Sequence, residues 1–295
     1  MTSPWILAAR PKTLPAAAAP VLVGSALALY RGGFALLPAT AALLGALLIQ
    51  IATNFANDYF DFVKGADTDE RVGPTRVTQA GLISPGAVRN AMLVTLGAAL
   101  LVGVYLVWIG GWPIVWIGLA SLVCAVAYTG GPFPLGYHGL GDLFVFVFFG
   151  LIAVAGTVYV QMGVFPPEAW LAGAGVGAMS TAILVVNNLR DIDTDARAGK
   201  RTLAVRLGRA GTQMEYVWLW SVAGLVPAVG ISAYGWPIWT VASWLGFGVA
   251  FPAMRRVWLH REPAELLPAL AQSAAGLLVY AVGLSAGLAM GLLAG

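Results

Sequence analysis

The chain has 295 residues, of which 59% are apolar and 10% are charged, and its mean hydropathy is +0.83. A soluble domain carries about 25% charged residues, so this composition excludes a soluble enzyme, a disordered chain and a nucleic-acid-binding protein. It indicates an integral membrane protein. The formal net charge of +3 needs no nucleic acid to explain it, because an excess of Lys and Arg in cytoplasmic loops has the same effect.

Nine apolar stretches follow one another along the chain, and most are long enough to cross a bilayer, which takes about 20 residues per helix. They cover residues 14–30, 36–57, 88–108, 112–128, 141–161, 168–188, 214–233, 236–254 and 265–292. We therefore predict an all-α, multi-spanning membrane protein with nine transmembrane helices. All 295 residues are expected to form a single membrane-embedded domain.

The basic residues predict which ends of these helices face the cytoplasm. If the N-terminus is cytoplasmic and the nine stretches alternate in direction, 15 of the 16 Lys and Arg residues fall in cytoplasmic segments. Only Arg31 then lies outside. Because cytoplasmic loops are enriched in Lys and Arg, we expect a cytoplasmic N-terminus and an external C-terminus.

The acidic residues are concentrated at the cytoplasmic ends of the second and sixth stretches. Eight of the 13 lie there, namely Asp58, Asp61, Asp67, Asp69 and Glu70 in one window and Asp191, Asp193 and Asp195 in the other. Carboxylates next to the hydrocarbon layer are costly, and such residues usually belong to a site or a pathway. The alternative is that they pair with neighbouring Lys and Arg in solvated loops, which is as plausible as a site for Asp69, Glu70 and Asp193.

Helical spacing indicates what kind of site these residues would form. Asn54, Asn57, Asp58 and Asp61 share one helix face, and so do Asn187, Asn188, Asp191 and Asp195. Carboxylate and amide oxygens suit Mg²⁺, which takes one or two carboxylates and fills its other positions with water and phosphate. Basic residues follow each cluster, namely Lys64, Arg71 and Arg76 after the first and Arg197, Lys200 and Arg201 after the second. This combination predicts a diphosphate site.

A short internal repeat connects the two acidic windows. Residues 67–73 read DTDERVG and residues 193–199 read DTDARAG, with five of seven positions identical. The repeat suggests a duplicated four-helix unit, about 1–138 and 139–260, plus a ninth helix. The two clusters would then face each other across a central cavity, as sites between repeats do in other membrane folds.

A third cytoplasmic segment, YTGGPFPLGYHGLGD at residues 128–142, is rich in Gly and Pro. These residues set turns and carry no chemistry themselves. Its polar side chains, which could orient an aromatic hydroxyl or carboxylate or simply stabilise a turn, are Tyr128, Tyr137, His138 and Asp142.

Together these motifs resemble the UbiA superfamily of intramembrane aromatic prenyltransferases. Asn57, Asp58 and Asp61 match its first motif, NDxxDxxxD, although Gly65 replaces the last Asp. Asp191 and Asp195 match the second motif, DxxxD. The segments that resemble the branch acting on 1,4-dihydroxy-2-naphthoate are RPKTLPAA, NDYFDFVKGAD, GPTR, GLISP, YTGGP and NNLRDIDTDARAGKRTLAVRLG.

The resemblance implies an activity and a role for each candidate residue. A polyprenyl group would pass from polyprenyl diphosphate to 1,4-dihydroxy-2-naphthoate with decarboxylation, giving demethylmenaquinone in menaquinone biosynthesis. The implied Mg²⁺ ligands are Asp58, Asp61, Asp191 and Asp195, assisted by Asn54, Asn57 or Asn188. The implied diphosphate ligands are Lys64, Arg76, Lys200 and Arg201. Tyr128, Asp67 or water would take the acceptor's proton, and the prenyl tail would lie between helices, open to the lipid bilayer of the cell membrane.

Two alternatives remain at this point. The first is a related prenyltransferase with another aromatic acceptor, such as 4-hydroxybenzoate. The second is an ion-coupled transporter, which should carry acidic residues near the middle of its spans, whereas here they cluster at the cytoplasmic ends.

Overall fold

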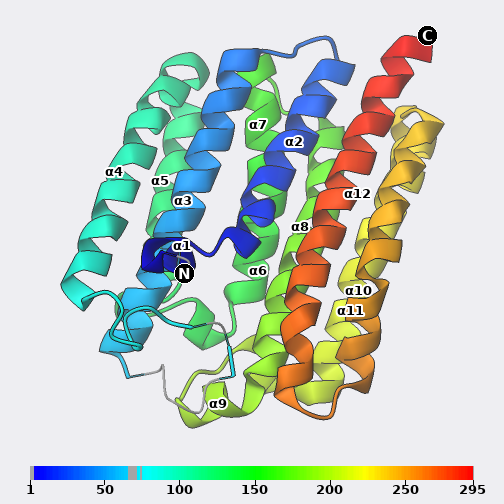
Figure 1. Cartoon of the computed structure of the whole chain (residues 1–295). Coiled ribbons are helices and arrows are strands. Elements are labelled where there is room, and N and C mark those ends of the chain that lie inside the picture. Colours follow the sequence, from blue (N-terminus) through cyan, green and yellow to red (C-terminus); the bar gives the residue numbers. More distant parts are fainter. Residues whose placement is uncertain (1–2, 66–71, 74, 295) are drawn as a thin grey trace.

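The structure is a computed structural model, which describes residues 3–65, 72–73 and 75–294 as a bundle of roughly parallel and antiparallel helices (Figure 1). Seven helical segments of this part are long and apolar enough to cross a membrane: Pro4–Tyr30, Leu36–Val63, Pro85–Gly110, Gly141–Met162, Pro167–Arg190, Leu203–Tyr234 and Pro263–Leu292. The chain is therefore an all-helical, multi-span membrane protein.

Most helices overlap the predicted stretches, but the helix predicted at 214–233 begins at Leu203 and the one predicted at 236–254 begins at Leu245. The first half contains α1 (Pro4–Ala9), η1 (Pro11–Thr13), α2 (Leu14–Tyr30), α3 (Leu36–Val63), α4 (Pro85–Gly110), α5 (Trp112–Ala127), η2 (Gly136–His138), α6 (Gly141–Phe146), η3 (Val147–Ile152) and α7 (Ala153–Met162). The second half contains α8 (Pro167–Arg190), α9 (Ile192–Arg197), α10 (Leu203–Tyr234), η4 (Ile238–Trp244), α11 (Leu245–Leu259), η5 (Pro263–Leu266) and α12 (Leu267–Ala294). α6, η3 and α7 form one continuous span with a π-helical turn, η3, in its middle.

Two of the nine predicted stretches form shorter helices than the others. Residues 112–128 give α5, an apolar helix of 16 residues. Residues 236–254 contain the 3-10 helix η4 and continue as α11. Three glycines of α12 bring its backbone against η4. These glycines are Gly283, Gly287 and Gly291, and a Cβ on any of them would overlap with residues 237–243.

The centre of the bundle is α8, which is the most deeply buried of the candidate spans. Its neighbours are α2, α10, α12 and the α6–α7 span. Small residues allow this close packing, since a Cβ at Gly150 would overlap with the backbone of Gly173 and Gly177. The core around α8 is a continuous apolar cluster that contains Met179, Trp220 and their neighbours.

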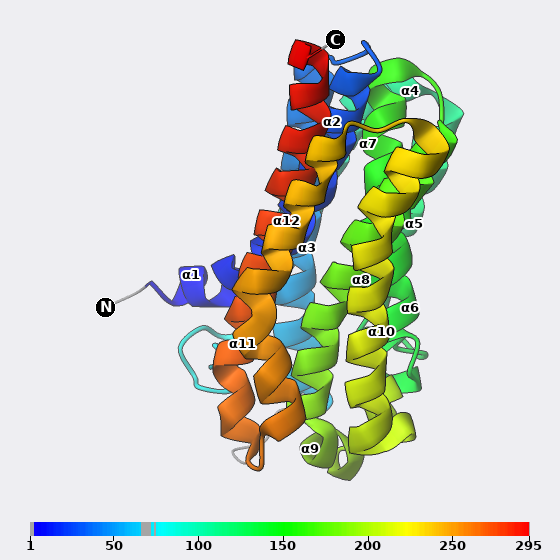
Figure 2. The ribbon, with the colours of Figure 1, turned by 90° about the vertical axis from the view of Figure 1, so that its right-hand side faces the viewer.

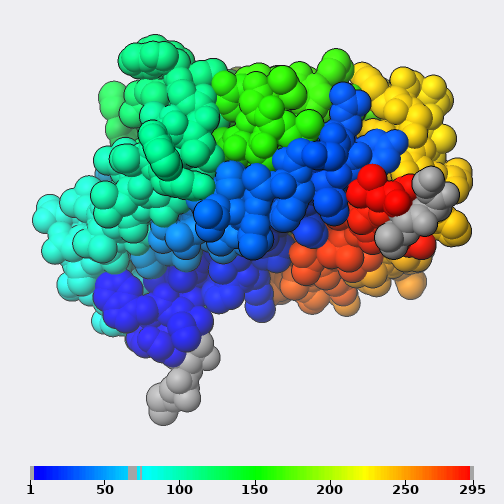
Figure 3. All heavy atoms as spheres, turned by 90° about the horizontal axis from the view of Figure 1, so that it is seen from above, coloured from blue at the N-terminus to red at the C-terminus, as the bar shows by residue number. Residues whose placement is uncertain are grey.

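The polar connections gather at one end of the bundle. In Figure 1 the segments after α3, α5 and α8 all lie at the lower end, opposite the C-terminus. α1 lies at a steep angle to the spans and projects beyond the outline of the bundle (Figures 2 and 3). Trp5, Ile6 and Leu7 on α1 are exposed, whereas Ala8 is buried.

α3 extends six residues beyond the predicted stretch and ends at Val63. Its last two turns therefore include Asp58 and Asp61, and both carboxylates are buried rather than in a solvated loop. Gly65, with φ +64°, follows the helix in the left-handed conformation that favours glycine. The first copy of the internal repeat falls mainly on residues 67–71, which lie outside the described residues, so the duplication stays a prediction.

Candidate active site

Asp61 is the centre of the polar end of the bundle. Its Oδ2 accepts a hydrogen bond of 2.9 Å from the guanidinium of Arg76. Its Oδ1 accepts one of 2.6 Å from the hydroxyl of Tyr137 and lies 3.4 Å from the Lys200 ammonium. The side chain is only 2% exposed. A buried carboxylate is stable when it is paired and hydrogen-bonded in this way.

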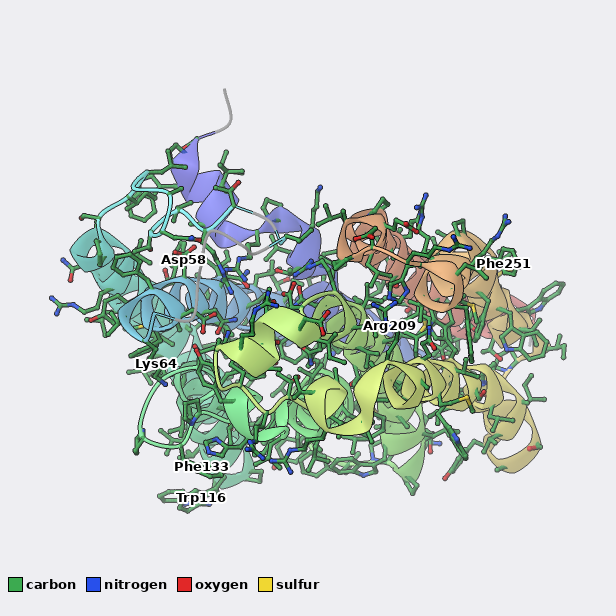
Figure 4. The ribbon with its side chains drawn as sticks, turned by 90° about the horizontal axis from the view of Figure 1, so that it is seen from below. Asp58, Lys64, Trp116, Phe133, Arg209 and Phe251 are labelled. Carbon is green, nitrogen blue, oxygen red and sulfur yellow. The ribbon has the colours of Figure 1, made fainter. Side chains whose placement is uncertain are left out.

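The second acidic window reaches the first through one lysine. Lys200 Nζ lies 3.4 Å from Asp61 and 3.8 Å from Asp195 of α9. The view onto this end of the bundle shows α9 beside the end of α3, where Asp58 and Lys64 are labelled (Figure 4). The prediction that the two windows come together is therefore supported by the contacts of Lys200.

Asp191 ends α8 and is held by the residue before it. The guanidinium of Arg190 donates to both carboxylate oxygens of Asp191, at 2.7 and 2.6 Å, and to Asn187 Oδ1 at 2.7 Å. Arg190 and Asp191 are both buried, as is the neighbouring Asn188. Arg190 was not among the predicted site residues, although a basic residue directly before a DxxxD motif was a visible signal.

Asp58 fixes the segment that follows α3. Its two carboxylate oxygens accept hydrogen bonds from the backbone N–H groups of Val77, at 3.2 Å, and Thr78, at 3.0 Å. The guanidinium of Arg10 lies 4.0 Å away. Because Arg76 directly precedes these two N–H groups, Asp58 also determines where the Arg76 side chain begins.

The two asparagines of the first window have different surroundings. The amide of Asn54 donates to the carbonyl of Ala9 at 2.9 Å and to the hydroxyl of Thr13 at 3.0 Å. It therefore joins α3 to the N-terminal segment. Asn57 Oδ1 accepts a hydrogen bond of 3.0 Å from Thr129, so this residue joins α3 to the segment after α5.

Tyr137 contacts three of the residues singled out by the sequence. Besides the hydrogen bond to Asp61, its ring lies under two ammonium groups, with Lys64 Nζ 4.9 Å and Lys200 Nζ 4.8 Å from the ring centroid. Distances below about 6 Å permit cation–π attraction. The sequence placed Tyr137 only among the polar residues of a turn, because the partner residues are 76, 73 and 63 positions away.

Lys64 also donates a hydrogen bond of 2.6 Å to the carbonyl of Thr129. Burial lowers the pKa of the Lys64 ammonium, the nearby Asp61 carboxylate opposes this effect, and the Lys200 charge lowers the pKa further. The ammonium therefore loses its proton at a lower pH than an ordinary lysine does. Its attraction for an anion weakens as the pH rises through this lowered value.

We predict that Lys64→Arg shifts the alkaline limb of the activity profile to higher pH. Arginine keeps its charge throughout the accessible range, whereas the Lys64 ammonium is neutralised early. The measurement is kcat/KM against pH for polyprenyl diphosphate, the donor that the sequence resemblance implies, because this ratio reports groups of the free enzyme. Lys12→Arg, at an exposed position, is the control. Identical alkaline limbs in the wild type and Lys64→Arg would exclude Lys64 from donor binding.

Tyr128 lies directly after α5, and two glycines further along the chain, Gly136 and Gly141, pack against it. A Cβ atom on Gly136 would lie 3.1 Å from the backbone carbonyl oxygen of Tyr128. A Cβ atom on Gly141 would lie 2.9 Å from the Tyr128 hydroxyl. Burial, followed by the charges of Asp142, Asp195 and Asp61, raises the pKa of the Tyr128 phenol well above its ordinary value. The phenol therefore stays protonated at neutral pH and acts as a hydrogen-bond donor.

The other predicted residues are placed less directly. The backbone N–H of Arg201 donates 2.8 Å to the carbonyl of Tyr137, while the Arg201 side chain is exposed. Asp67 lies outside the described residues.

Within the described residues, no three His, Cys, Asp or Glu side chains are close enough together to enclose a metal ion. Mg²⁺ commonly completes its coordination with oxygens of water and of a bound phosphate.

A large apolar cavity of about 390 Å³ lies between α2, α3, α4, α5 and the α6–α7 span. Gln50, Thr53 and Tyr128 line it near the polar end of the bundle. Leu100 and Val104 of α4 and Leu119 of α5 also line it, although about half of each side chain is exposed. The cavity therefore reaches the outer surface of the bundle between α4 and α5, where lipid would surround it.

Comparison with known proteins identifies the family. A model of the UbiA prenyltransferase family matches residues 17–271. The chain belongs to this family. The UbiA relatives include the 1,4-dihydroxy-2-naphthoate octaprenyltransferases of Mycobacterium tuberculosis, 40% identical over 97% of each chain, and Haemophilus influenzae, 39% identical over 97% of this chain and 96% of the relative. The Escherichia coli protein of the same name is 37% identical over 94% of this chain and 92% of the relative.

Solved structures share the UbiA fold. The apo structure of a UbiA homologue from Aeropyrum pernix has a TM-score of 0.71 at 18% identity and covers 94% of this chain and 98% of its own. A UbiA homologue from Archaeoglobus fulgidus, bound to DMAPP and Mg²⁺, has a TM-score of 0.62 at 15% identity and covers 97% and 99%. Because these sequence identities are low, the similarity shows a shared fold only. DMAPP and Mg²⁺ are ligands of the Archaeoglobus homologue.

Proposed function

We propose that this chain transfers a polyprenyl group from polyprenyl diphosphate to 1,4-dihydroxy-2-naphthoate. The allylic C–O bond of the donor breaks, a ring carbon of the acceptor forms the new C–C bond, and the acceptor's carboxyl group leaves as carbon dioxide. The pyrophosphate is released, and the product is demethylmenaquinol, the reduced form of demethylmenaquinone. The names of the bacterial relatives, at 37–40% identity over nearly the whole chain, support this choice of acceptor.

The observation that carries the proposal is the position of the charged cluster beside the apolar cavity. Tyr128 lines the cavity and is also affected by the charges of Asp61 and Asp195. One molecule with an anionic head and a long apolar tail can therefore occupy both regions. A polyprenyl diphosphate has this shape and charge.

The acidic residues fit a Mg²⁺-diphosphate complex. Asp61 and Asp195 are within reach of one ammonium group, and Asp58 and Asp191 lie on the same two helix ends. We propose these four as the Mg²⁺ ligands, with Asn57 and Asn188 nearby and Asn54 acting mainly through the N-terminal segment. When bound, Mg²⁺ would neutralise the diphosphate and favour its departure.

The basic residues supply the remaining positive charge. Lys64, Lys200 and Arg76 surround Asp61, and we propose that they contact the diphosphate oxygens, with Arg201 at the exposed edge. Charges fixed in place before the reaction stabilise the departing pyrophosphate more strongly than water does, because they need no reorganisation. Tyr128 would donate a hydrogen bond to the acceptor at the inner end of the cavity, and water or Asp67 would take the acceptor's proton.

A bulky residue inside the apolar cavity tests the position of the tail. Gly103 of α4 lines the cavity and has open space around it. We expect Gly103→Phe to raise the KM for an octaprenyl donor about tenfold or more. The KM for a five-carbon donor should change little. Gly97→Phe is the matched control, because Gly97 is on the same helix, also has open space, and is exposed outside the cavity. Equal KM values for both donors in Gly103→Phe would place the tail elsewhere.

We also propose that the polar end of the bundle faces the cytoplasm. The connections after α3, α5 and α8 lie at one end of the bundle, beside the acidic windows, and carry six of the 16 Lys and Arg residues (Figure 1). Their excess of Lys and Arg supports a cytoplasmic side. The protein would then be a multi-pass protein of the cytoplasmic membrane with its site open to soluble acceptor.

The direct test uses the purified protein in detergent or lipid. We would add 1,4-dihydroxy-2-naphthoate and octaprenyl diphosphate, with and without Mg²⁺, and identify products by mass spectrometry. A Mg²⁺-dependent product with the mass of the joined molecules less carbon dioxide is expected. Turnover only with 4-hydroxybenzoate or another phenol would overturn the acceptor, and substrate flux in vesicles without any prenylated product would favour a transporter.

A further inference from the structure

We propose that Tyr137 is the positioning residue that holds Asp61, Lys64 and Lys200 together as one diphosphate-binding unit. This inference rests on the proposed function, because it assigns a task at the same site. Tyr137 comes from the η2 turn after α5, whereas Asp61 and Lys64 come from the end of α3 and Lys200 follows α9. One side chain thus connects three separate parts of the chain.

The hydroxyl of Tyr137 fixes one side of the Asp61 carboxylate. The distance between Tyr137 Oη and Asp61 Oδ1 is 2.6 Å, which is typical of a charge-assisted O–H to carboxylate hydrogen bond. Arg76 holds the other oxygen at 2.9 Å. The carboxylate is therefore oriented from both sides. Groups that hydrogen-bond to a metal-binding carboxylate orient it, and their loss typically lowers metal affinity or activity 10–100-fold.

The ring of Tyr137 contacts two ammonium groups. The ammonium groups of Lys64 and Lys200 lie 4.9 and 4.8 Å from its centroid. Two ammonium groups repel each other, and the negative face of the ring offsets part of this repulsion. Both cations are consequently collected beside Asp61 before a polyanionic ligand arrives.

Lys200 divides its contacts between two carboxylates and the Tyr137 ring. Its distance of 3.4 Å to Asp61 is longer than that of the tyrosine hydroxyl. We infer that Lys200, together with Lys64, turns toward the diphosphate, while Tyr137 keeps Asp61 in position. The hydroxyl and the ring thus have separable tasks: the hydroxyl orients the carboxylate, and the ring collects the cations.

The backbone of this turn is held independently of the Tyr137 side chain. The carbonyl of Tyr137 accepts a hydrogen bond of 2.8 Å from the N–H of Arg201, and its own N–H donates 3.1 Å to the carbonyl of Pro134. The guanidinium of Arg206 donates 2.8 Å to the carbonyl of His138. Substitution of the tyrosine side chain should therefore leave the turn in place.

Two variants separate the two tasks. Tyr137→Phe removes the hydroxyl and keeps the ring, whereas Tyr137→Leu removes both. Affinity for a donor analogue, farnesyl thiolodiphosphate, is measured by calorimetry in EDTA, and Mn²⁺ binding in the presence of the analogue is measured by electron paramagnetic resonance. Neither measurement requires turnover. Tyr105→Leu, near the C-terminal end of α4, controls for the loss of a tyrosine, and thermal unfolding verifies the fold.

In EDTA, we expect the affinity of Tyr137→Phe for the analogue to be within about threefold of that of the wild type. Its affinity for Mn²⁺ and its turnover rate should each be at least tenfold lower. Tyr137→Leu should in addition lose about tenfold in analogue affinity without metal. Equal analogue affinity in both variants would overturn the role of the ring, and unchanged Mn²⁺ binding in Tyr137→Phe would overturn that of the hydroxyl. If the wild type formed no prenylated naphthoquinol but the analogue result held, only the proposed function would fail.

Discussion

Asp61→Asn is expected to reduce kcat by about 10³-fold or more. Asn keeps the size of the side chain but removes the negative charge that Arg76, Lys200 and Tyr137 surround. Three partners then face a neutral amide, and the proposed metal loses its most central ligand. Loss of a single preorganised electrostatic contact already costs about 10²–10³-fold in other enzymes.

The measurement is single-turnover prenyl transfer at saturating donor and Mg²⁺, so that weaker binding does not hide the chemical step. Asp193→Asn is the matched control, because Asp193 lies on α9 in the same acidic window but is exposed. It should retain nearly full activity. Activity of Asp61→Asn within tenfold of the wild type would remove Asp61 from the site.

Asp58→Ala is expected to lose both activity and stability, because Asp58 accepts the backbone N–H groups of Val77 and Thr78. Alanine leaves these two buried donors without an acceptor, and each such group costs about 1–3 kcal/mol. Arg76, which directly precedes them, would lose its fixed position beside Asp61. We expect a clear decrease in the thermal unfolding midpoint and a loss of about 10²-fold or more in kcat/KM.

Asp58→Asn separates the two effects, since its amide oxygen can still accept one of the N–H groups. It should recover most of the stability and little of the activity. The assay is thermal unfolding in detergent alongside kcat/KM. If Asp58→Ala unfolded at the wild-type temperature, the N–H contacts would not stabilise this segment, and only a ligand role would remain for Asp58.

The sequence identified the acidic residues and two of the basic residues beside Asp61, Arg76 and Lys200, but not every residue that holds the carboxylates. Asp61 and Asp195 are recognisable because apolar helices rarely end in carboxylates at helical spacing. Arg10 and Tyr137 have no comparable pattern, and Arg190 is marked only by its place directly before the DxxxD motif. Their roles depend on contacts with residues elsewhere in the chain or on the direction of one side chain.

The sequence by itself determined the membrane class, the order and approximate limits of the helices and the two clusters that carry the proposed chemistry. These properties depend on hydropathy and on the 3.6-residue period, which are local. Only the tertiary structure decided that Lys200 joins the clusters, that Asp58 holds a backbone segment, and that an apolar cavity begins beside Tyr128. Such features depend on how α8 and its glycines bring the helices together, and packing between distant segments leaves no periodic pattern in the sequence.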